Sequence, residues 1–374
     1  MDDSLVVTPP YLAGPLRLLP FRGLMLAPRR IGDPGAARAF ARPYRDVTRR
    51  LGRWEQQGQV HHDSEPAVYL HEYTSRGITV RGLVGALDIS HRAHDRADRA
   101  VYPHEGIHPL QVAELAERMV EMQMNPAPIL LVHRGHAEAR HIIQGLLATP
   151  PDHAFTDRGD QQHRIWAIRD PAQLEALDEA LAESRALIAD GHHRYAAYIR
   201  LQQQHPGGAY DLGLAMLVDQ DDTPLFLGAI HRVFPGVGLD DLELAAASRG
   251  VGFRTCTETE AVALLGPETL VATDGSRWAT LQLTVPRTRA AVEILHEDLV
   301  PALAHDPGTV GRHHSVEDAM AHLAEVSGIA ILLPAPDFDL VLRIVAADRL
   351  LPEKATSFQP KPNMGVLIRS LRDA

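Results

Sequence analysis

Residues 186–195 read Ala-Leu-Ile-Ala-Asp-Gly-His-His-Arg-Tyr, and this stretch decides the fold class. Its four apolar residues are typical of a short strand buried in a sheet. A polar turn follows, and the residues from Tyr195 to Gln204 predict a helix that stops before Pro206. A buried strand that passes directly into a helix is typical of α/β proteins. We therefore expect an α/β (α+β) fold with its working site at this turn.

The remaining sequence predicts a mixed β-sheet with flanking helices. Val, Leu and Tyr are enriched over 67–72 and 78–87 on either side of a short polar turn, which indicates a β-hairpin. Asp170, Pro171 and Gln173 form a helix-start pattern, because Asp can cap, Pro suits the first position and Gln completes a capping box. We expect further helices from about residue 109 and over 239–248, 290–304, 316–326 and 338–350, and further strands over 129–132, 212–218, 225–234, 329–333 and 365–368.

The chain is expected to form two lobes. Residues 1–236 would form an N-terminal lobe that carries the turn, after a Pro- and Arg-rich start of about 60 residues that wraps the surface. Residues 237–374 would form a C-terminal α/β lobe. Its polar loop contains Lys354 and Lys361 between prolines. We expect this lysine loop to fold back onto the turn and to bind phosphate or a substrate carboxylate.

The composition is that of an ordinary globular protein with a negative charge. The chain has 374 residues, 23% of them charged, and a formal net charge of −11. This charge argues against a nucleic-acid partner, because such binding needs clustered Lys and Arg on the phosphates.

No apolar run approaches the roughly 20 residues of a membrane span, and the acidic start differs from a secretory signal. The single cysteine, Cys256, agrees with a reducing compartment. We expect a cytoplasmic protein without a membrane partner, and a homo-oligomer stays open.

The turn at 190–194 has the chemistry of an anion-binding site. The first N–H groups of a helix point outward, and the helix dipole adds partial positive charge there. Gly191 permits a positive φ or the close approach of a ligand. His192, His193 and Arg194 add donors around the same position. Asp190 is the exception, because a carboxylate beside an anion is costly unless it binds a metal ion, accepts a proton from a hydroxyl or caps the helix.

Two other interpretations of these residues stay open. In the simpler one, Asp190 only caps the helix and the histidines bond to the backbone. In the other, histidine pairs such as those at 61–62, 192–193 and 313–314 bind a metal ion, although scattered histidines in an Arg-rich chain usually lie on the surface. The turn also lacks the Lys and Ser or Thr of a Walker motif.

Seven short motifs carry a family resemblance. They are Pro-Phe-Arg at 20–22, Pro-Tyr-Arg-Asp at 43–46, Pro-His-Glu at 103–105, Asn-Pro-Ala-Pro at 125–128, Ile-Ala-Asp-Gly-His-His-Arg-Tyr at 188–195, His-Arg at 231–232, and Pro-Glu-Lys-Ala-Thr-Ser-Phe-Gln-Pro-Lys at 352–361. Together they resemble the bacterial and archaeal domain-of-unknown-function-1015 family, which is often found beside genes of serine biosynthesis. The turn is more distantly similar to the phosphate-binding motif of the ParB and sulfiredoxin superfamily, which includes kinases that phosphorylate free serine.

The resemblance implies nucleotide phosphate at the turn and a ParB/sulfiredoxin-like core in the N-terminal lobe. The leading hypothesis is a nucleotide-dependent phosphotransferase, or kinase, that uses ATP or ADP with Mg²⁺ and acts on a small hydroxyl compound, with free L-serine the preferred acceptor. The residues assigned to phosphate or nucleotide binding are Gly191, His192, His193, Arg194, Lys354 and Lys361. Catalysis is assigned to Asp190, Glu105 and His192, with Asp190 also as the Mg²⁺ ligand. Substrate binding is assigned to Tyr195, His231, Arg232 and Thr356.

Three alternative functions remain at this stage. The same site could act as a phosphatase on phosphoserine-like substrates, with water in place of the acceptor hydroxyl. It could be a nucleotide-binding switch without catalysis. A third possibility is a metal-dependent hydrolase that uses His192 and His193.

Overall fold

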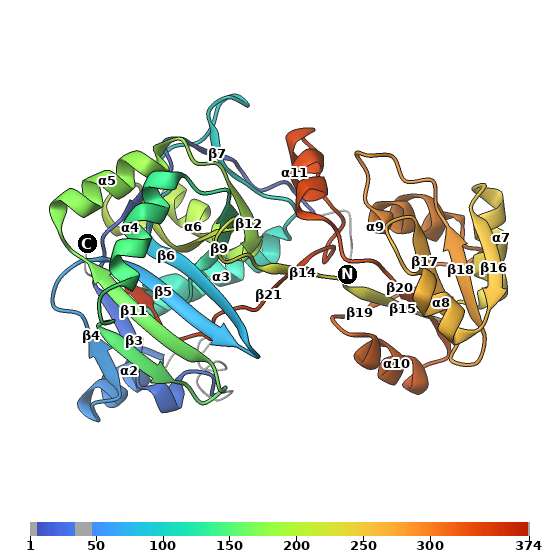
Figure 1. The fold of residues 1–374 in the computed structure, drawn as a ribbon, viewed down its shortest axis with the longest axis horizontal. Helices are drawn as coiled ribbons and strands as arrows, with labels where there is room; N and C mark the ends of the chain where they lie inside the picture. The colour runs from blue at the N-terminus through green and yellow to red at the C-terminus, as the bar shows by residue number, and fades with distance from the viewer. Residues whose placement is uncertain (1–5, 34–46, 373–374) are drawn as a thin grey trace. The chain divides into compact units, whose positions relative to one another are not determined.

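The computed structural model describes residues 6–33 and 47–372. The predicted motif at 43–46 and the acidic start of the chain lie outside the described residues. The chain divides into two compact units, drawn in Figure 1. Unit 1 consists of Met1–Pro103, Ile107–Leu225 and Pro360–Ala374, and unit 2 consists of His104–Gly106 and Phe226–Gln359. The two lysines of the predicted loop therefore belong to different units, Lys354 to unit 2 and Lys361 to unit 1.

Unit 1 contains a mixed sheet with ten strands in the described part of the chain. In order across the sheet these are β1 (Leu12–Ala13), β7 (Arg99–Tyr102), β12 (Ala186–Asp190), β9 (Ile129–His133), β13 (Leu212–Asp219), β6 (Ile78–Asp88), β5 (Val68–Ser75), β11 (Gln162–Ile168) and β10 (His153–Thr156), with β2 (Leu18–Leu19) paired to β6. The hairpin of β5 and β6 and the strand β12 confirm the predicted elements, and the fold is mixed α/β as expected.

Helices α3, α4, α5 and α6 of unit 1 pack in two pairs against this sheet. The helical segments are η2 (Pro28–Arg30), α2 (Val47–Gln56), α3 (Pro109–Met122), α4 (Ala137–Leu147), α5 (Pro171–Ala182), α6 (His192–Gln204) and η3 (Gly208–Asp211). Helix α3 packs against α6, and α4 against α5. The predicted cap of α5 is confirmed, because the Asp170 carboxylate accepts the Gln173 N–H at 2.9 Å. Buried residues of all four helices share one core with the sheet. This packing holds α6, which follows β12 in sequence, against the sheet.

A smaller sheet joins the two ends of unit 1. Its order is β4 (Val60–His62), β3 (Gly23–Leu26), β22 (Ile368–Ser370) and β8 (Met124–Asn125). The expectation that the first 60 residues only wrap the surface is wrong, because all four residues of β3 are buried. The last strand is expected from residue 365 but begins at Ile368. Its residues pair with β3 and β8.

Unit 2 has a second mixed arrangement of strands and helices. Its main sheet runs in the order β16 (Gly252–Cys256), β18 (Trp278–Gln282), β17 (Thr269–Thr273), β20 (Gly328–Leu332), β15 (His231–Pro235) and β19 (Gly311–His313), and β14 (Phe226–Gly228) pairs separately with β21 (Ser357–Gln359). Its helical segments are α7 (Leu239–Ser248), α8 (Glu258–Leu264), α9 (Ala291–Glu293), the π-helical η4 (Ile294–Leu299), η5 (Val300–Ala302), α10 (Val316–Glu325) and α11 (Phe338–Ala346).

Two predicted elements of unit 2 differ from the structure. The single strand expected over 225–234 is two strands, because β14 pairs with β21 whereas β15 pairs with β19 and β20 in another sheet. The helix expected over 290–304 changes from α to π and then to 3₁₀ geometry. Pro301 stands in its last turn, where a proline supplies no N–H for the α-helical pattern.

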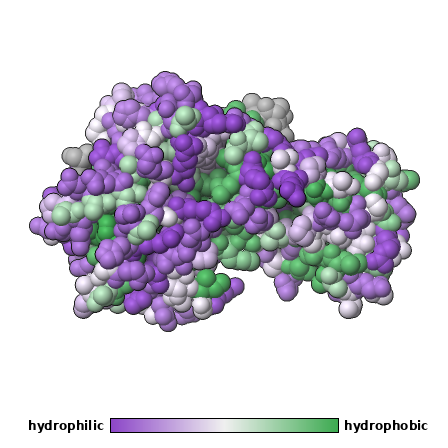
Figure 2. Space-filling view, turned by 45° about the horizontal axis from the view of Figure 1, so that its top comes forward, coloured by the Kyte–Doolittle hydropathy of each residue, from purple (hydrophilic) through white to green (hydrophobic). Residues whose placement is uncertain are grey.

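The face of the molecule drawn in Figure 2 is largely polar. Hydrophilic residues cover most of the face drawn in Figure 2, and the hydrophobic residues on it form separate patches. Within 6–33 and 47–372, no helix has the length and apolar character needed to cross a bilayer.

Candidate functional site

The strand before the turn changes its pairing at the last residue. β12 runs parallel to β7 and antiparallel to β9. Ile188 lies opposite Leu131, but Asp190 lies opposite Leu130, so one residue of β12 is extra at this point. Such a bulge bends a strand and redirects the side chains that follow it. The irregularity therefore sets the direction in which the Asp190 carboxylate leaves the sheet.

Gly191 makes the connection from strand to helix. It is the N-cap of α6 with φ 94° and ψ 30°, a left-handed conformation that favours glycine. A Cβ at this position would lie 3.1 Å from Arg194 Nε and 3.2 Å from Ile129 Cγ2. The Tyr195 N–H donates to the Gly191 carbonyl at 2.8 Å, so the helix starts at His192, three residues earlier than predicted. The whole run from His192 to Arg194 thus forms the first turn, at the positive end of the helix dipole.

Two cations hold the Asp190 carboxylate. Arg194 donates through Nη2 to Asp190 Oδ2 at 2.6 Å and through Nη1 to the Pro128 carbonyl at 2.7 Å. Lys361 Nζ contacts the other oxygen, Oδ1. The exposed fractions of the side chains are 22% for Arg194, 29% for Asp190 and 41% for Lys361. One carboxylate with two cations leaves a net positive charge beside the helix start, which favours an anion there.

Lys361 is unusual in this chain. Among 37 lysine and arginine residues, only Lys354 and Lys361 are lysines. Lysine carries its charge on a flexible stem, so its amine can turn to a ligand more easily than an arginine held at two points. The structure brings Lys361 to the turn as predicted for the lysine loop, although it does so within unit 1.

The two histidines of the turn have different surroundings. His193 Nε2 accepts the N–H of His108 at 3.1 Å, and the two rings are stacked with centroids 5.9 Å apart. In this contact, Nε2 of the His193 imidazole is the acceptor. His193 thereby ties the start of α6 to the start of α3. The side chain of His192 is largely buried in the same turn.

Tyr195, which sequence reasoning assigned to substrate binding, packs into the core of unit 1. It is fully buried, and its hydroxyl donates to the Pro10 carbonyl at 2.6 Å. Burial raises the pKa of this phenol. The residue lies one helical turn beyond Gly191 and packs into the core, so its role is to fix α6.

Glu105 and the loop around Lys354 form a cluster inside unit 2. Ala355 N–H donates to Glu105 Oε1 at 3.1 Å, and the backbone N–H groups of Lys354 and Thr356 also interact with this carboxylate. Burial raises the pKa of Glu105, while the Lys354 charge and these N–H groups act in the opposite direction. His104 Nε2 lies 2.6 Å from Thr356 Oγ1. These contacts describe a carboxylate that holds a loop closed within unit 2.

Arg232 and His231, predicted to bind substrate, lie in the interior of unit 2. The guanidinium of Arg232 is fully buried and donates to the carbonyls of Ile230, Glu353 and Lys354. Burial lowers its pKa to about 10. His231 Nδ1 accepts the Leu333 N–H at 3.2 Å. The predicted site residues therefore divide between the turn with Lys361 in unit 1 and a loop-holding cluster in unit 2.

The Glu105→Ala variant tests this structural role. We expect it to lower the free energy of unfolding by about 2–4 kcal/mol, because the loop N–H groups lose a buried acceptor. Glu105→Gln keeps one acceptor oxygen and should lose less. Urea denaturation measures both. A Glu105→Gln protein with wild-type stability but without turnover would instead make Glu105 a catalytic residue.

A family match agrees with the motifs at the turn. The family model described as "Protein of unknown function (DUF1015)" matches residues 25–297. The chain belongs to the DUF1015 family. No curated protein matches the chain.

Several solved structures are similar to this DUF1015 protein. A variant of free serine kinase in complex with ADP is 16% identical, with a TM-score of 0.40, covering 72% of this chain and 89% of that one. A conserved hypothetical protein from Pyrococcus furiosus is 16% identical, with a TM-score of 0.40 and coverage of 73% and 93%. SbnI with a C-terminal truncation from Staphylococcus aureus is 12% identical, with a TM-score of 0.43 and coverage of 76% and 87%. At this level of similarity, the activity must be inferred from the residues of the chain itself.

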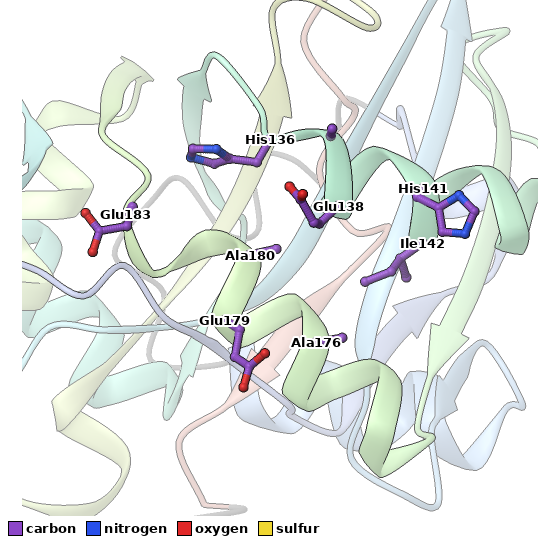
Figure 3. A pocket seen from close by; sticks show the side chains of 9 residues that line it. His136, Glu138, His141, Ile142, Ala176, Glu179, Ala180 and Glu183 are labelled. Atoms are coloured by element: carbon purple, nitrogen blue, oxygen red, sulfur yellow. The ribbon is translucent and has the colours of Figure 1, made fainter.

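A groove formed by other residues of unit 1 has the wrong charge for phosphate. It lies between α4 and α5, and Figure 3 shows carboxylates of both helices around it. Its volume is about 700 Å³, and the residues that line it are His136, Ala137, Glu138, His141, Ile142, Ala176, Glu179, Ala180 and Glu183. None of the predicted site residues is among them, and its acidic rim would repel an anion. The turn, where Arg194 and Lys361 meet Asp190, is the candidate site of the DUF1015 protein.

Sequence reasoning missed the groups that hold the two cations in place. The Pro128 carbonyl binds Arg194 from 66 residues away, and Gln161 Nε2 donates to the Lys361 carbonyl from 200 residues away. The Asn-Pro-Ala-Pro motif at 125–128 was a signal for the first contact. The second had no local signal. In the ranges that the structure describes, no three His, Cys, Asp or Glu side chains are grouped to hold a metal ion.

Proposed function

We propose that the DUF1015 protein is a nucleotide-dependent phosphotransferase that acts on a small hydroxyl compound, with free L-serine as the first acceptor to test. The observation that carries the proposal is the placement of Arg194 and Lys361 on the two oxygens of Asp190, at the start of α6. Phosphoryl transfer requires positioning and charge neutralisation more than covalent participation of the protein. This turn supplies both.

The phosphate oxygens would bind at the first turn of α6. The backbone N–H groups of a helix start and the helix dipole favour phosphate, and Arg194 and Lys361 add two formal charges. Gly191 has no side chain, so phosphate oxygens could approach the backbone closely. The proposed ligands are ATP or ADP, in keeping with this concentration of positive charge in a chain whose net charge is −11.

Asp190 would then have one of two tasks. It could accept the proton of the attacking hydroxyl, or it could hold Mg²⁺ together with the nucleotide phosphates, since Mg²⁺ commonly takes one or two carboxylates and phosphate oxygens. Arg194 is fixed by a second contact at Pro128, but Lys361 is more exposed and flexible. Lys361 can therefore turn from Asp190 to a phosphate, which exposes one carboxylate oxygen for either task.

A ligand-binding experiment tests the nucleotide. ATP and ADP, with and without Mg²⁺, are added to the full chain, and thermal unfolding is recorded. A ligand present at 100 times its dissociation constant should stabilise the fold by about 2.7 kcal/mol. No shift with any nucleotide would contradict the proposal.

Arg194 should matter for this binding. We expect Arg194→Ala to weaken nucleotide affinity by about 10- to 100-fold, because it removes charge-assisted hydrogen bonds at the phosphate site. Arg200→Ala is the matched control, because Arg200 is exposed on the same helix. Titration calorimetry measures both, and equal affinities in the two variants would remove Arg194 from the site.

The acceptor is tested by product analysis. The chain is incubated with ATP and L-serine. The amounts of O-phosphoserine and ADP that form are then measured, and transfer to serine should yield the two products in equal amounts. Release of phosphate from O-phosphoserine without nucleotide would favour the phosphatase. Nucleotide binding without any turnover would favour the switch.

A further inference from the structure

The main chain that carries Lys361 has no regular structure of its own. Residues 360–363 lie between the last two strands without helical or strand geometry. Side chains from the large sheet hold this segment in place. Tyr73 on β5 donates its hydroxyl to the Pro360 carbonyl at 2.7 Å. The position of Lys361 is therefore decided by residues distant in sequence.

The Gln161 side chain forms hydrogen bonds with the segment on both sides of Pro362. Its Nε2 donates to the Lys361 carbonyl at 2.9 Å, and its Oε1 accepts the Asn363 N–H at 2.9 Å. The side chain is largely buried. One amide group thus binds a carbonyl and an N–H of the same segment, which a carboxylate of equal size cannot do.

Asp157 fixes both Gln161 and the far end of the segment. Its Oδ1 accepts the N–H groups of Gly159 at 2.8 Å and Gln161 at 3.0 Å. Its Oδ2 accepts Asn363 Nδ2 at 2.8 Å and His163 Nε2 at 3.0 Å. This carboxylate is buried and bonded to four donors, so it holds the turn between β10 and β11 against residue 363.

The network continues into the sheet through two buried histidines. His163 Nδ1 lies 3.0 Å from His71 Nε2, which stands on β5. Since Asp157 is the acceptor for His163 Nε2–H, His163 Nδ1 accepts and His71 donates. Burial lowers the pKa of both histidines, so they remain neutral at pH 7. The network therefore connects the Asp157 carboxylate to β5 through two buried histidines.

We propose that Gln161 and Asp157 are positioning residues that hold Lys361 Nζ at the phosphate turn. This inference rests on the proposed function and names the residues that make Lys361 effective. A lysine side chain loses much rotamer freedom when it binds a ligand. A fixed main chain lowers the entropy lost in placing its amine, so the network prepares the site before the nucleotide arrives.

The first test needs no nucleotide. Lys354 and Lys361 are the only lysines, so mild acylation followed by mass spectrometry reports the two ε-amines separately. In Gln161→Ala, the acylation rate of the Lys361 amine should rise about fivefold for each hydrogen bond lost, because the amine is held less firmly at Asp190. The acylation rate of Lys354 should not change and serves as the reference. Gln282→Ala, an exposed glutamine of unit 2, is the control. An unchanged Lys361 rate in Gln161→Ala would overturn the inference.

The second test separates positioning from general stability. Nucleotide affinity is measured for Gln161→Ala, Lys361→Met and the double variant. We expect Gln161→Ala to weaken affinity about fivefold or more in the wild-type background and less than about twofold in Lys361→Met, because both changes act through the same amine. Equal losses in both backgrounds would make Gln161 merely structural. Asn363→Ala, which removes only the contact with Asp157, replaces Gln161→Ala if that variant does not fold.

The two tests distinguish the inference from the proposed function. A faster Lys361 reaction in Gln161→Ala, together with no nucleotide binding by the wild-type chain, would uphold the positioning and reject the nucleotide. Nucleotide binding that depends on Lys361 but not on Gln161 would uphold the proposed function and reject the positioning.

Discussion

The Asp190→Asn variant of the DUF1015 protein should lose turnover by about 10²- to 10⁴-fold, the range expected when a positioned acid–base group is removed. Its affinity for nucleotide without Mg²⁺ should stay the same or increase. The amide that replaces the carboxylate carries no charge, so Arg194 and Lys361 become more available to phosphate. Phosphoserine formation and titration calorimetry measure the two quantities separately.

A loss of turnover without a loss of affinity makes the prediction specific. A variant that merely fails to fold would lose affinity and turnover together. Asp178→Asn is a suitable control, because Asp178 forms a partly exposed ion pair with Arg17 away from the turn. Turnover by Asp190→Asn at the wild-type rate would show that the carboxylate has no part in the chemistry.

The Arg369→Met variant should lower the free energy of unfolding by about 3–5 kcal/mol, because it leaves buried acceptors without a donor. Arg369 is almost fully buried on β22. It donates to Asn125 Oδ1 at 3.0 Å and to the carbonyls of Leu212 at 3.0 Å and Ala209 at 2.9 Å. Methionine fills much of the volume but supplies none of these bonds.

Chemical denaturation checks this prediction. Arg372→Met is the matched control, since Arg372 is exposed just beyond β22 and its replacement should change stability by less than about 0.5 kcal/mol. A loss in Arg369→Met no larger than in the control would mean that the C-terminal segment contributes little to unit 1. The same segment carries Lys361, so its anchoring by Arg369 also bears on the candidate site.

The motifs of the chain have two separate physical explanations. At the turn, Gly191, Arg194 and Lys361 gather positive charge at a helix start. In unit 2, Glu105 and Arg232 bind the backbone of the loop that contains Lys354. A carboxylate and a guanidinium buried in this way are stabilising only while their partners remain in place. The sequence assigned both groups to one catalytic set, and that assignment remains a prediction.

Some features of the DUF1015 protein followed from the sequence alone, because their causes are local. The apolar run before Asp190 and the polar turn after it predicted β12 and the start of a helix. The capping pattern at Asp170 predicted α5, and the turn before Gly77 predicted the hairpin of β5 and β6. In each case, neighbouring residues supply the hydrogen bonds and the burial pattern that decide the conformation.

Only the tertiary structure decided which cations meet Asp190 and which residues hold them. Lys361 reaches Asp190 across 171 residues, and Gln161 reaches the Lys361 carbonyl across 200. It likewise placed Lys354 and Lys361 in different units, because β21 pairs in unit 2 and β22 in unit 1. Such contacts depend on strand pairing and core packing between distant segments. A local pattern of residues predicts neither of them.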